Sequence, residues 1–149
     1  MTEYHLSTYS SEHYDACLAL FDANCPEFFA PNERSEYAEF LRRVNGEYLV
    51  CLNGANVLAA FGVVDENIAH RRRLNWIMVS PEHHGVGMGT IIMQQTEQLV
   101  RKARASIIDI SASHKSAAFF ARFGAKKIKH IENGWGPKIH RIEMEWSLD

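Results

Sequence analysis

Two hydrophobic periodicities, one typical of helices and one typical of strands, alternate along the chain. Apolar residues recur at every third or fourth position, as in helices that bury one face, in residues 11–23, 33–44, 87–103 and 115–123. Short apolar or alternating runs, typical of strands, occupy residues 4–8, 47–52, 57–64, 73–79, 106–110, 125–131 and 138–146. The order of strand, two helices, three strands, helix, strand, helix and two strands predicts an α/β (α+β) fold built on a mixed sheet.

Turn-forming residues mark several boundaries between these segments. Asn45–Gly46 is expected to end the second helix, and residues 53–56, with the sequence Asn-Gly-Ala-Asn, predict a hairpin. Residues 133–137, with the sequence Asn-Gly-Trp-Gly-Pro, form a turn-rich insert between the last two strands. No repeat, low-complexity run or linker interrupts the chain, so we expect residues 1–149 to form one domain.

Composition and charge narrow the class of protein. The 149 residues are 46% hydrophobic and 23% charged, as in ordinary globular proteins, and a net charge of −2 gives no strong attraction to nucleic acid or an anionic membrane surface. Cys17, Cys25 and Cys51 have neither disulfide-framework nor zinc-finger spacing. No stretch has the pattern of a leader or a membrane span. We therefore expect a cytoplasmic protein without nucleic-acid or membrane partners.

The stretch richest in chemistry is residues 75–90, where a strand runs into three alternating glycines that open the longest helix. Gly85, Gly87 and Gly89 have no Cβ, so their backbone N–H groups can approach a ligand closely. The N-terminus of the following helix adds unpaired donors and positive potential. The combination predicts a cradle for a phosphate or pyrophosphate group.

Two general glycine loops fit this stretch poorly. A nucleotide P-loop ends in Gly-Lys-Ser/Thr, but residues 88–90 are Met-Gly-Thr and contain no lysine. A dinucleotide G-x-G-x-x-G fingerprint would place its third glycine at Thr90, although Asp109 does lie about 20 residues further on, where a ribose ligand is expected.

A third interpretation is a family resemblance carried by two motifs. Residues 84–89, His-Gly-Val-Gly-Met-Gly, resemble motif A (Q/R-x-x-G-x-G/A) of the GNAT superfamily of acyl-CoA N-acyltransferases, and residues 79–82 resemble its V-x-P-E. Residues 113–124 resemble the second cofactor motif, N-x-x-A-x-x-F-Y-x-x-x-G-F, with Phe120 where Tyr is frequent. The resemblance implies a single-domain fold with a mostly antiparallel sheet of about seven strands flanked by about four helices.

The same resemblance implies transfer of an acetyl group from acetyl-CoA to a primary amine by direct attack on the thioester. The amides of residues 84–90 would hold the pyrophosphate, and a strand amide near Met78 would stabilise the oxyanion. For Phe119 and Phe120, core packing is the alternative. The implied cofactor-binding residues are Ile77, Met78, Val79, His84, Gly85, Val86, Gly87, Met88, Gly89, Thr90, Ser113, Ser116, Phe119 and Phe120.

Proton transfer has several candidate residues. An alkyl amine has a pKa of about 10, so a carboxylate or an imidazole must take a proton before the attack. Glu33 and Glu27, between the first two helices, and His114, beside the second motif, are the candidate bases. Phe120 has no hydroxyl to protonate the departing thiolate, so water, His114 or Ser116 is the donor.

The remaining histidines and the last tryptophan carry weaker signals. Residues 83–84 are adjacent histidines, while His114, His130 and His140 are distant in sequence, and no pair has metal-ligand spacing. We therefore predict no metal site. Trp135 either lines the acceptor pocket or covers the core.

Three functions stay open on the sequence alone. The first is a cytoplasmic N-acetyltransferase that uses acetyl-CoA as co-substrate and a small-molecule or peptide amine as acceptor. The second is a noncatalytic acyl-CoA-binding or regulatory module, suggested by Phe120, and the third is a nucleotide-binding protein using the same glycine turn. An exposed sheet edge would also allow a homodimer.

Overall fold

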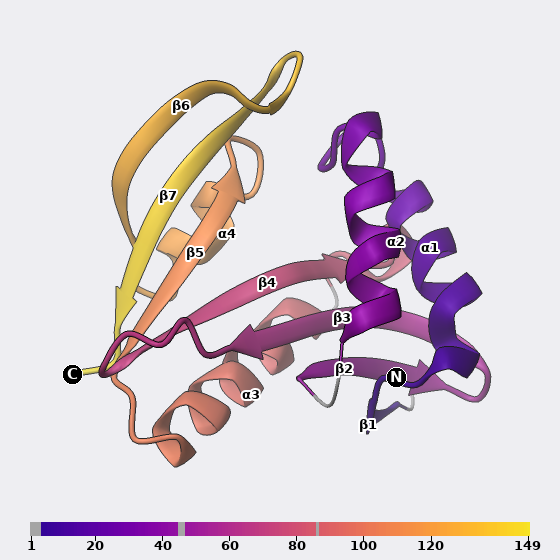
Figure 1. Cartoon of the computed structure of the whole chain (residues 1–149), viewed down its shortest axis with the longest axis horizontal. Helices are drawn as coiled ribbons and strands as arrows, with labels where there is room; N and C mark the ends of the chain where they lie inside the picture. The colour runs from indigo at the N-terminus through magenta and orange to yellow at the C-terminus, as the bar shows by residue number, and fades with distance from the viewer. Residues whose placement is uncertain (1–3, 45–46, 86) are drawn as a thin grey trace.

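The computed structural model describes residues 4–44, 47–85 and 87–149 and confirms the order of elements predicted from the sequence (Figure 1). The strands are β1 (His5–Thr8), β2 (Tyr48–Asn53), β3 (Asn56–Val64), β4 (Arg71–Val79), β5 (Ile107–Ser113), β6 (Lys126–Gly136) and β7 (Ile139–Ser147). The helices are α1 (Tyr14–Ala23), α2 (Arg34–Arg43), α3 (Met88–Lys102) and α4 (Ala117–Ala121), with 3₁₀ turns at Ser11–His13, Pro31–Glu33 and Pro81–His83.

All seven of these strands join one sheet in the order β1-β2-β3-β4-β5-β7-β6. The pairing is parallel between β4 and β5 and antiparallel at the other five contacts. The expected mixed, mostly antiparallel sheet is therefore confirmed. Its two edges are β1 and β6, which lie far apart in space (Figure 1).

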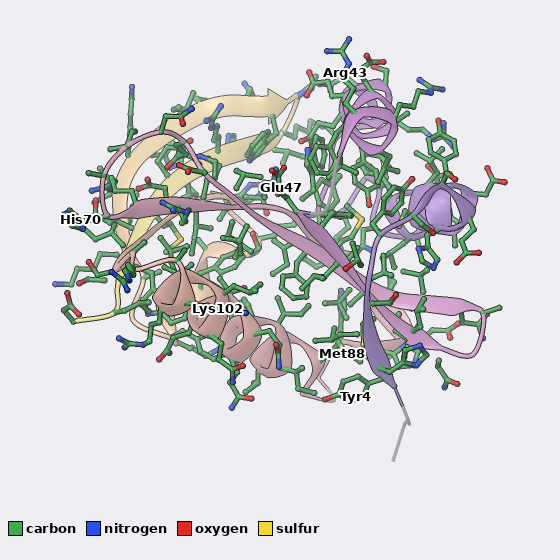
Figure 2. The ribbon with its side chains drawn as sticks, turned by 60° about the horizontal axis from the view of Figure 1, so that its bottom comes forward. Tyr4, Arg43, Glu47, His70, Met88 and Lys102 are labelled. Atoms are coloured by element: carbon green, nitrogen blue, oxygen red, sulfur yellow. The ribbon has the colours of Figure 1, made fainter. Side chains whose placement is uncertain are left out.

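Helices cover the two faces of the sheet unequally. α1 and α2 pack on one face of β2, β3 and β4, around a buried cluster that includes Phe21, Tyr37 and Tyr48. α3 lies on the opposite face, where Ile92 and Phe61 belong to a second cluster that continues under β5 and β7. Figure 2 shows α3 on the other side of the sheet from α2. Burial of these apolar faces gives each helix its place.

The insert predicted at residues 133–137 belongs largely to strand β6. β6 continues to Gly136, which pairs with Ile139 at the start of β7, after a register shift that follows Ile131. Asn133 has a positive φ of 52°, so the chain bends within the strand instead of leaving it. The predicted helix end at Asn45–Gly46 and the predicted cofactor contact at Val86 lie outside the described residues.

β4 and β5 separate halfway along their length. They pair from Arg71 to Leu74, opposite residues 107–110, and their described residues beyond that point have no partner across this seam. A register shift between β3 and β4 follows, and Trp76 within it has a positive φ of 45°. Such a bulge bends a strand. The bend in β4 leaves the backbone edges of both strands open at their ends.

Candidate active site

A cavity of about 520 Å³ lies where β4 and β5 separate. Its wall is built by the connection between α1 and α2, the end of β4, the glycine turn, the end of β5, α4 and the tip of β6. The lining residues are Asn24, Phe28, Phe29, Glu33, Arg73, Leu74, Asn75, Trp76, Ile77, Met78, Val79, His83, His84, Gly85, Gly89, Ile110, Ser111, Ala112, Ser113, Lys115, Ser116, Phe119, Phe120, Arg122, Trp135 and Arg141.

The glycine turn has the backbone conformation that its composition predicts. Gly85 and Gly87 have φ values of 82° and 87°, in the left-handed region that disfavours residues with a Cβ. Gly87 is the N-cap of α3, so the N–H groups of the first helical turn, including those of Met88 and Thr90, have no partner within the helix. Gly85 and Gly89 line the cavity, so this group of donors lies next to one end of it.

The third glycine serves packing between two helices. A Cβ on Gly89 would lie 2.6 Å from Cε1 of Phe119, so a larger residue here would displace the Phe119 ring from its place against α3. Phe119 also lines the cavity, and its neighbour Phe120 is 3% exposed and belongs to the core around α3. Both residues therefore line the cavity and pack in or against the core, the alternative named for them, while their contact with a cofactor stays a prediction.

Two side chains hold the carbonyl group at the end of β4. Asn24 Nδ2 donates a hydrogen bond to the oxygen of Val79 at 3.1 Å, and His84 Nε2 lies 2.9 Å from the same oxygen. The ring of His84 also packs edge-on against Phe28. Since a carbonyl oxygen has two lone pairs, this oxygen is fully engaged, and the N–H of Val79 is left for a ligand.

The strand register changes the expected role of Met78. The N–H of Ser80, directly after β4, donates to the carbonyl oxygen of Leu58 in β3. Hydrogen-bonded pairs recur at every second residue of an antiparallel ladder, so Met78, which lies opposite Ala60, is also hydrogen-bonded to β3. The amide of Met78 is therefore directed away from the cavity, a correction to the predicted oxyanion contact. Backbone groups alternate along a strand, so the amides of the neighbouring residues 77 and 79 are directed to the open seam.

The two serines of the second motif bond mainly to each other. Ser113 N–H donates to Ser116 Oγ at 3.0 Å, and the two hydroxyl oxygens are 3.2 Å apart. Ser113 Oγ also accepts from the N–H groups of Lys115 and Ser116. Both serines line the cavity, but their hydroxyls are engaged in shaping the turn that leads into α4.

The candidate bases differ sharply in their surroundings. Glu33 lines the cavity, is 3% exposed and accepts a hydrogen bond from the N–H of Ala30 at 2.8 Å. Burial raises the pKa of Glu33 to about 7, against the lowering effect of that hydrogen bond. Glu27 is exposed and His114 is not part of the cavity wall; His114 Nδ1 accepts the N–H of His140. Among the three candidate bases, Glu33 is the one that lines the cavity.

A group of hydrogen-bonded polar side chains at the cavity was not predicted from the sequence. Arg73 donates to Ser111 Oγ at 2.7 Å, and Ser111 donates in turn to the carboxylate of Glu143. The guanidinium of Arg141 lies 4.9 Å from the ring centre of Trp135, and the indole N–H of Trp135 donates to the carbonyl of Ala112 at 2.9 Å. Alternating charges on the last strand were the available signal, but the residues they meet depend on the sheet register.

Comparisons with known proteins agree with this geometry. Residues 16–125 match the model of the Acetyltransferase (GNAT) family. No curated protein sequence matches the chain significantly. Within the described residues, no helix is long and apolar enough to cross a membrane.

Solved structures share the fold at low sequence identity. The ribosomal-protein-S18-alanine N-acetyltransferase from Escherichia coli has a TM-score of 0.77 at 12% identity, over 99% of this chain and 95% of that one. An aminoglycoside 6'-N-acetyltransferase in complex with coenzyme A has a TM-score of 0.76 at 14% identity, over 97% of each chain. The structure of yncA from Salmonella typhimurium with its cofactor acetyl-CoA has a TM-score of 0.73 at 13% identity, over 99% of this chain and 95% of that one.

Proposed function

This chain belongs to the GNAT family of acetyltransferases, and from that premise we propose how its residues transfer an acetyl group from acetyl-CoA to a primary amine. The observation that carries the proposal is one cavity that joins a donor-rich glycine turn to the buried carboxyl of Glu33. The first feature suits a pyrophosphate and the second suits a proton acceptor. In this proposal, residues 1–149 form one catalytic domain.

The cofactor enters this proposal through backbone groups. The N–H groups of Gly85, Gly87 and the first turn of α3 hold the pyrophosphate of acetyl-CoA. The pantetheine arm lies in the seam between β4 and β5, where it pairs with the backbone of Ile77 and the N–H of Val79 as an added strand would. His84 and Asn24 keep the Val79 carbonyl in place, so the adjacent N–H keeps its direction.

The chemical step needs one proton acceptor and one oxyanion donor. Glu33 takes a proton from the ammonium group of the acceptor, directly or through water, and the neutral amine attacks the thioester carbon. An N–H of residue 77 or 79 donates to the oxyanion that forms. As the C–N bond forms, the attacking nitrogen gives up its second proton to water, the C–S bond breaks, and coenzyme A leaves as a thiolate.

The departing thiolate takes its proton from water in this proposal. Phe120 has no hydroxyl, the hydroxyls of Ser113 and Ser116 bond to each other, and His114 is not part of the cavity wall. A thiol has a pKa of about 8.5, so its thiolate is a good leaving group without prior protonation.

The acceptor amine approaches between the α1–α2 connection and the tip of β6. Phe28 and Phe29 line one side and Trp135 the other, so the acceptor is a small-molecule or peptide amine that presents an apolar or aromatic surface next to its amino group. Asn32 Nδ2 donates to the carbonyl oxygen of Trp135 at 3.0 Å and links these two walls.

The test is a pair of glycine variants with acetyl-CoA. Gly87→Glu places a strained, negatively charged residue in the cradle, while Gly54→Glu makes the same change at another positive-φ glycine, in the β2–β3 turn. We expect acetyl-CoA to raise the melting temperature of the wild type and of Gly54→Glu but not of Gly87→Glu. Unchanged acetyl-CoA affinity in Gly87→Glu overturns the proposed cradle.

Turnover is then measured as release of coenzyme A with a panel of amines. The proposal expects release with at least one aromatic or apolar primary amine, and less of it with Gly87→Glu than with Gly54→Glu. Saturable cofactor binding without turnover on any amine would instead support an acyl-CoA-binding module.

Location and assembly complete the proposal. Free, largely buried thiols at Cys17 and Cys51, with Cys25 partly buried, support a reducing cytoplasm. The unpaired outer edges of β1 and β6 support a homodimer formed through a sheet edge. Analytical ultracentrifugation at several protein concentrations tests the dimer.

A further inference from the structure

Three potential metal ligands meet at the end of the β6–β7 hairpin. One nitrogen each of His130 and His140 and one oxygen of Glu132 lie within 4.8 Å of one another. The two histidines are separated in sequence, and we predicted no metal site from their spacing. The hairpin brings them together because His130 lies opposite Ile142, which places His140 diagonally across from it on the same face.

The separations between these atoms are those of ligands around a bound ion. His130 Nε2 lies 3.5 Å from one oxygen of Glu132, and His140 Nδ1 lies 3.6 Å from the other. Both distances are longer than an ordinary hydrogen bond. In a tetrahedral zinc site with bonds of about 2.0–2.2 Å, two ligand atoms lie about 3.3–3.6 Å apart. The two contacts with Glu132 therefore have nearly the spacing that a shared ion requires.

The donor set also selects the kind of ion. Two imidazole nitrogens and one carboxylate oxygen suit zinc and neighbouring transition metals, whereas calcium and magnesium prefer an all-oxygen set. Glu132 brings a negative charge that partly offsets the charge of the ion. We propose that His130, Glu132 and His140 bind a divalent transition-metal ion of the zinc class, with water completing the shell.

A neighbouring histidine holds the backbone of one of the ligands. His114 Nδ1 accepts the backbone N–H of His140 at 3.1 Å, and the two rings are 4.7 Å apart. This contact fixes the backbone that carries His140. Support of this kind around a ligand is what gives a metal site its geometry.

Metal binding has a local structural consequence. The N–H of Asn133 donates to His140 Nδ1 at 3.0 Å, so an ion bound at this nitrogen replaces that hydrogen bond. Asn133 begins the bent segment that carries Trp135, whose ring lines the cavity. The ion therefore acts on the same segment that forms one wall of the acceptor region, and tryptophan fluorescence reports its arrival.

The experiment is calorimetric titration of the full-length chain, freed of metal with a chelator, with zinc chloride. We expect one ion per chain with a dissociation constant in the micromolar range. His130→Gln and His140→Gln are each expected to weaken binding by at least about tenfold. His5→Gln, which removes an exposed histidine from β1 at the opposite edge of the sheet, serves as the matched control and keeps the wild-type affinity.

A third variant tests the carboxylate ligand without changing the shape of the hairpin. Glu132→Gln keeps the size of the side chain and the exposed position but removes the anionic ligand, so it also weakens zinc binding. All variants should keep the wild-type melting temperature without metal. Zinc binding that is absent up to millimolar concentration, or equally strong in the wild type and in the three variants, overturns the proposal. The result is independent of whether the acetyl-transfer proposal holds, because no cofactor is added.

Discussion

The two halves of the sheet differ in what covers them. β2, β3 and β4 carry α1 and α2 on one face and α3 on the other, whereas, among the residues that the structure describes, β5, β7 and β6 have helices against one face only (Figure 1). In the covered half, the Tyr48 hydroxyl is buried and bonded to Tyr37 and to the carbonyl of Trp76. Where the covered half meets the half-open part, polar contacts such as that of Arg73 in β4 with Ser111 in β5 are partly exposed.

This difference explains where the cavity lies. A sheet covered on both faces is rigid but has no room for a substrate, and a face left open has room but little burial to fix side chains. The seam between β4 and β5 is the place where the two conditions meet. Glu33 is supplied by the covered half and Trp135 by the open half, so each half contributes one wall of the cavity.

The largest expected effect comes from replacing Glu33, which we propose as the proton acceptor. Glu33→Gln should lower kcat/KM by about 100- to 10,000-fold, the usual contribution of a general base, because its amide cannot take a proton. Wild-type kcat/KM should rise with pH and level off above about 7, where Glu33 is ionised, and the variant should lose this rise. Steady-state kinetics across pH measure both; Glu27→Gln, at an exposed glutamate, should behave as the wild type.

A truncation in the core of the covered half should have the largest effect on stability. Phe61 in β3 is fully buried in the cluster around α3, so Phe61→Ala should lower the free energy of unfolding by about 3–5 kcal/mol. Urea denaturation followed by circular dichroism gives the value. A loss below about 1 kcal/mol would mean that this half is not the rigid part of the molecule.

The buried carboxyl should make stability depend on pH in a defined direction. The pKa of Glu33 is raised to about 7 in the folded chain, so its contribution is fully present below the pKa of an unfolded glutamate and is lost as pH rises to about 7. The loss amounts to about 3 kcal/mol. Unfolding free energies at pH 5 and pH 8 should differ less in Glu33→Gln than in the wild type, while Glu27→Gln should keep the full difference.

Removing a buried hydroxyl from the covered half should have an intermediate effect. Tyr48 is 0% exposed, and its hydroxyl donates to the carbonyl of Trp76 at 2.6 Å. Tyr48→Phe leaves that carbonyl and the hydroxyl of Tyr37 without this partner, which should cost about 1–3 kcal/mol. Thermal and urea unfolding measure the change, and an unchanged melting temperature would show that water replaces the lost contact.

The smallest effect is expected in the open half. Ser111→Ala removes the hydroxyl that links Arg73 to Glu143, but these charged groups are partly exposed and water can replace the contact. We expect a loss of less than about 1 kcal/mol. If Ser111→Ala destabilised the chain more than Tyr48→Phe, the contrast between the two halves would be wrong.

The elements of the fold could be predicted because their signals are local. Periodic apolar residues identify helix α3 and the strands around it, and the alternating glycines indicate the positive φ values that Gly85 and Gly87 adopt at its start. The sequence also allowed Glu33 to be predicted as one of the candidate bases. Its burial, and hence its raised pKa, depends on how the α1–α2 connection folds over the sheet, which no spacing encodes.

The parts that could not be predicted depend on strand register. Whether the amide of Met78 faces the cavity or β3 is decided by a one-residue bulge at Trp76. His130 and His140 look unrelated until the hairpin aligns them. Contacts between distant segments of this kind are set by pairing across the whole sheet, so a single sequence read locally cannot reveal them.

The hydrogen bond from Asn32 to Trp135 has a consequence for how this scaffold could be re-engineered. It joins two segments that we assign to acceptor selection, the Pro31–Glu33 turn and the β6 tip, and neither contributes to the glycine turn or to α4. Grafting both segments together from another protein, with Glu33 retained, should change which amine is accepted while the acetyl donor is handled as before. New specificities on this framework would then arise by exchanging a matched pair of loops.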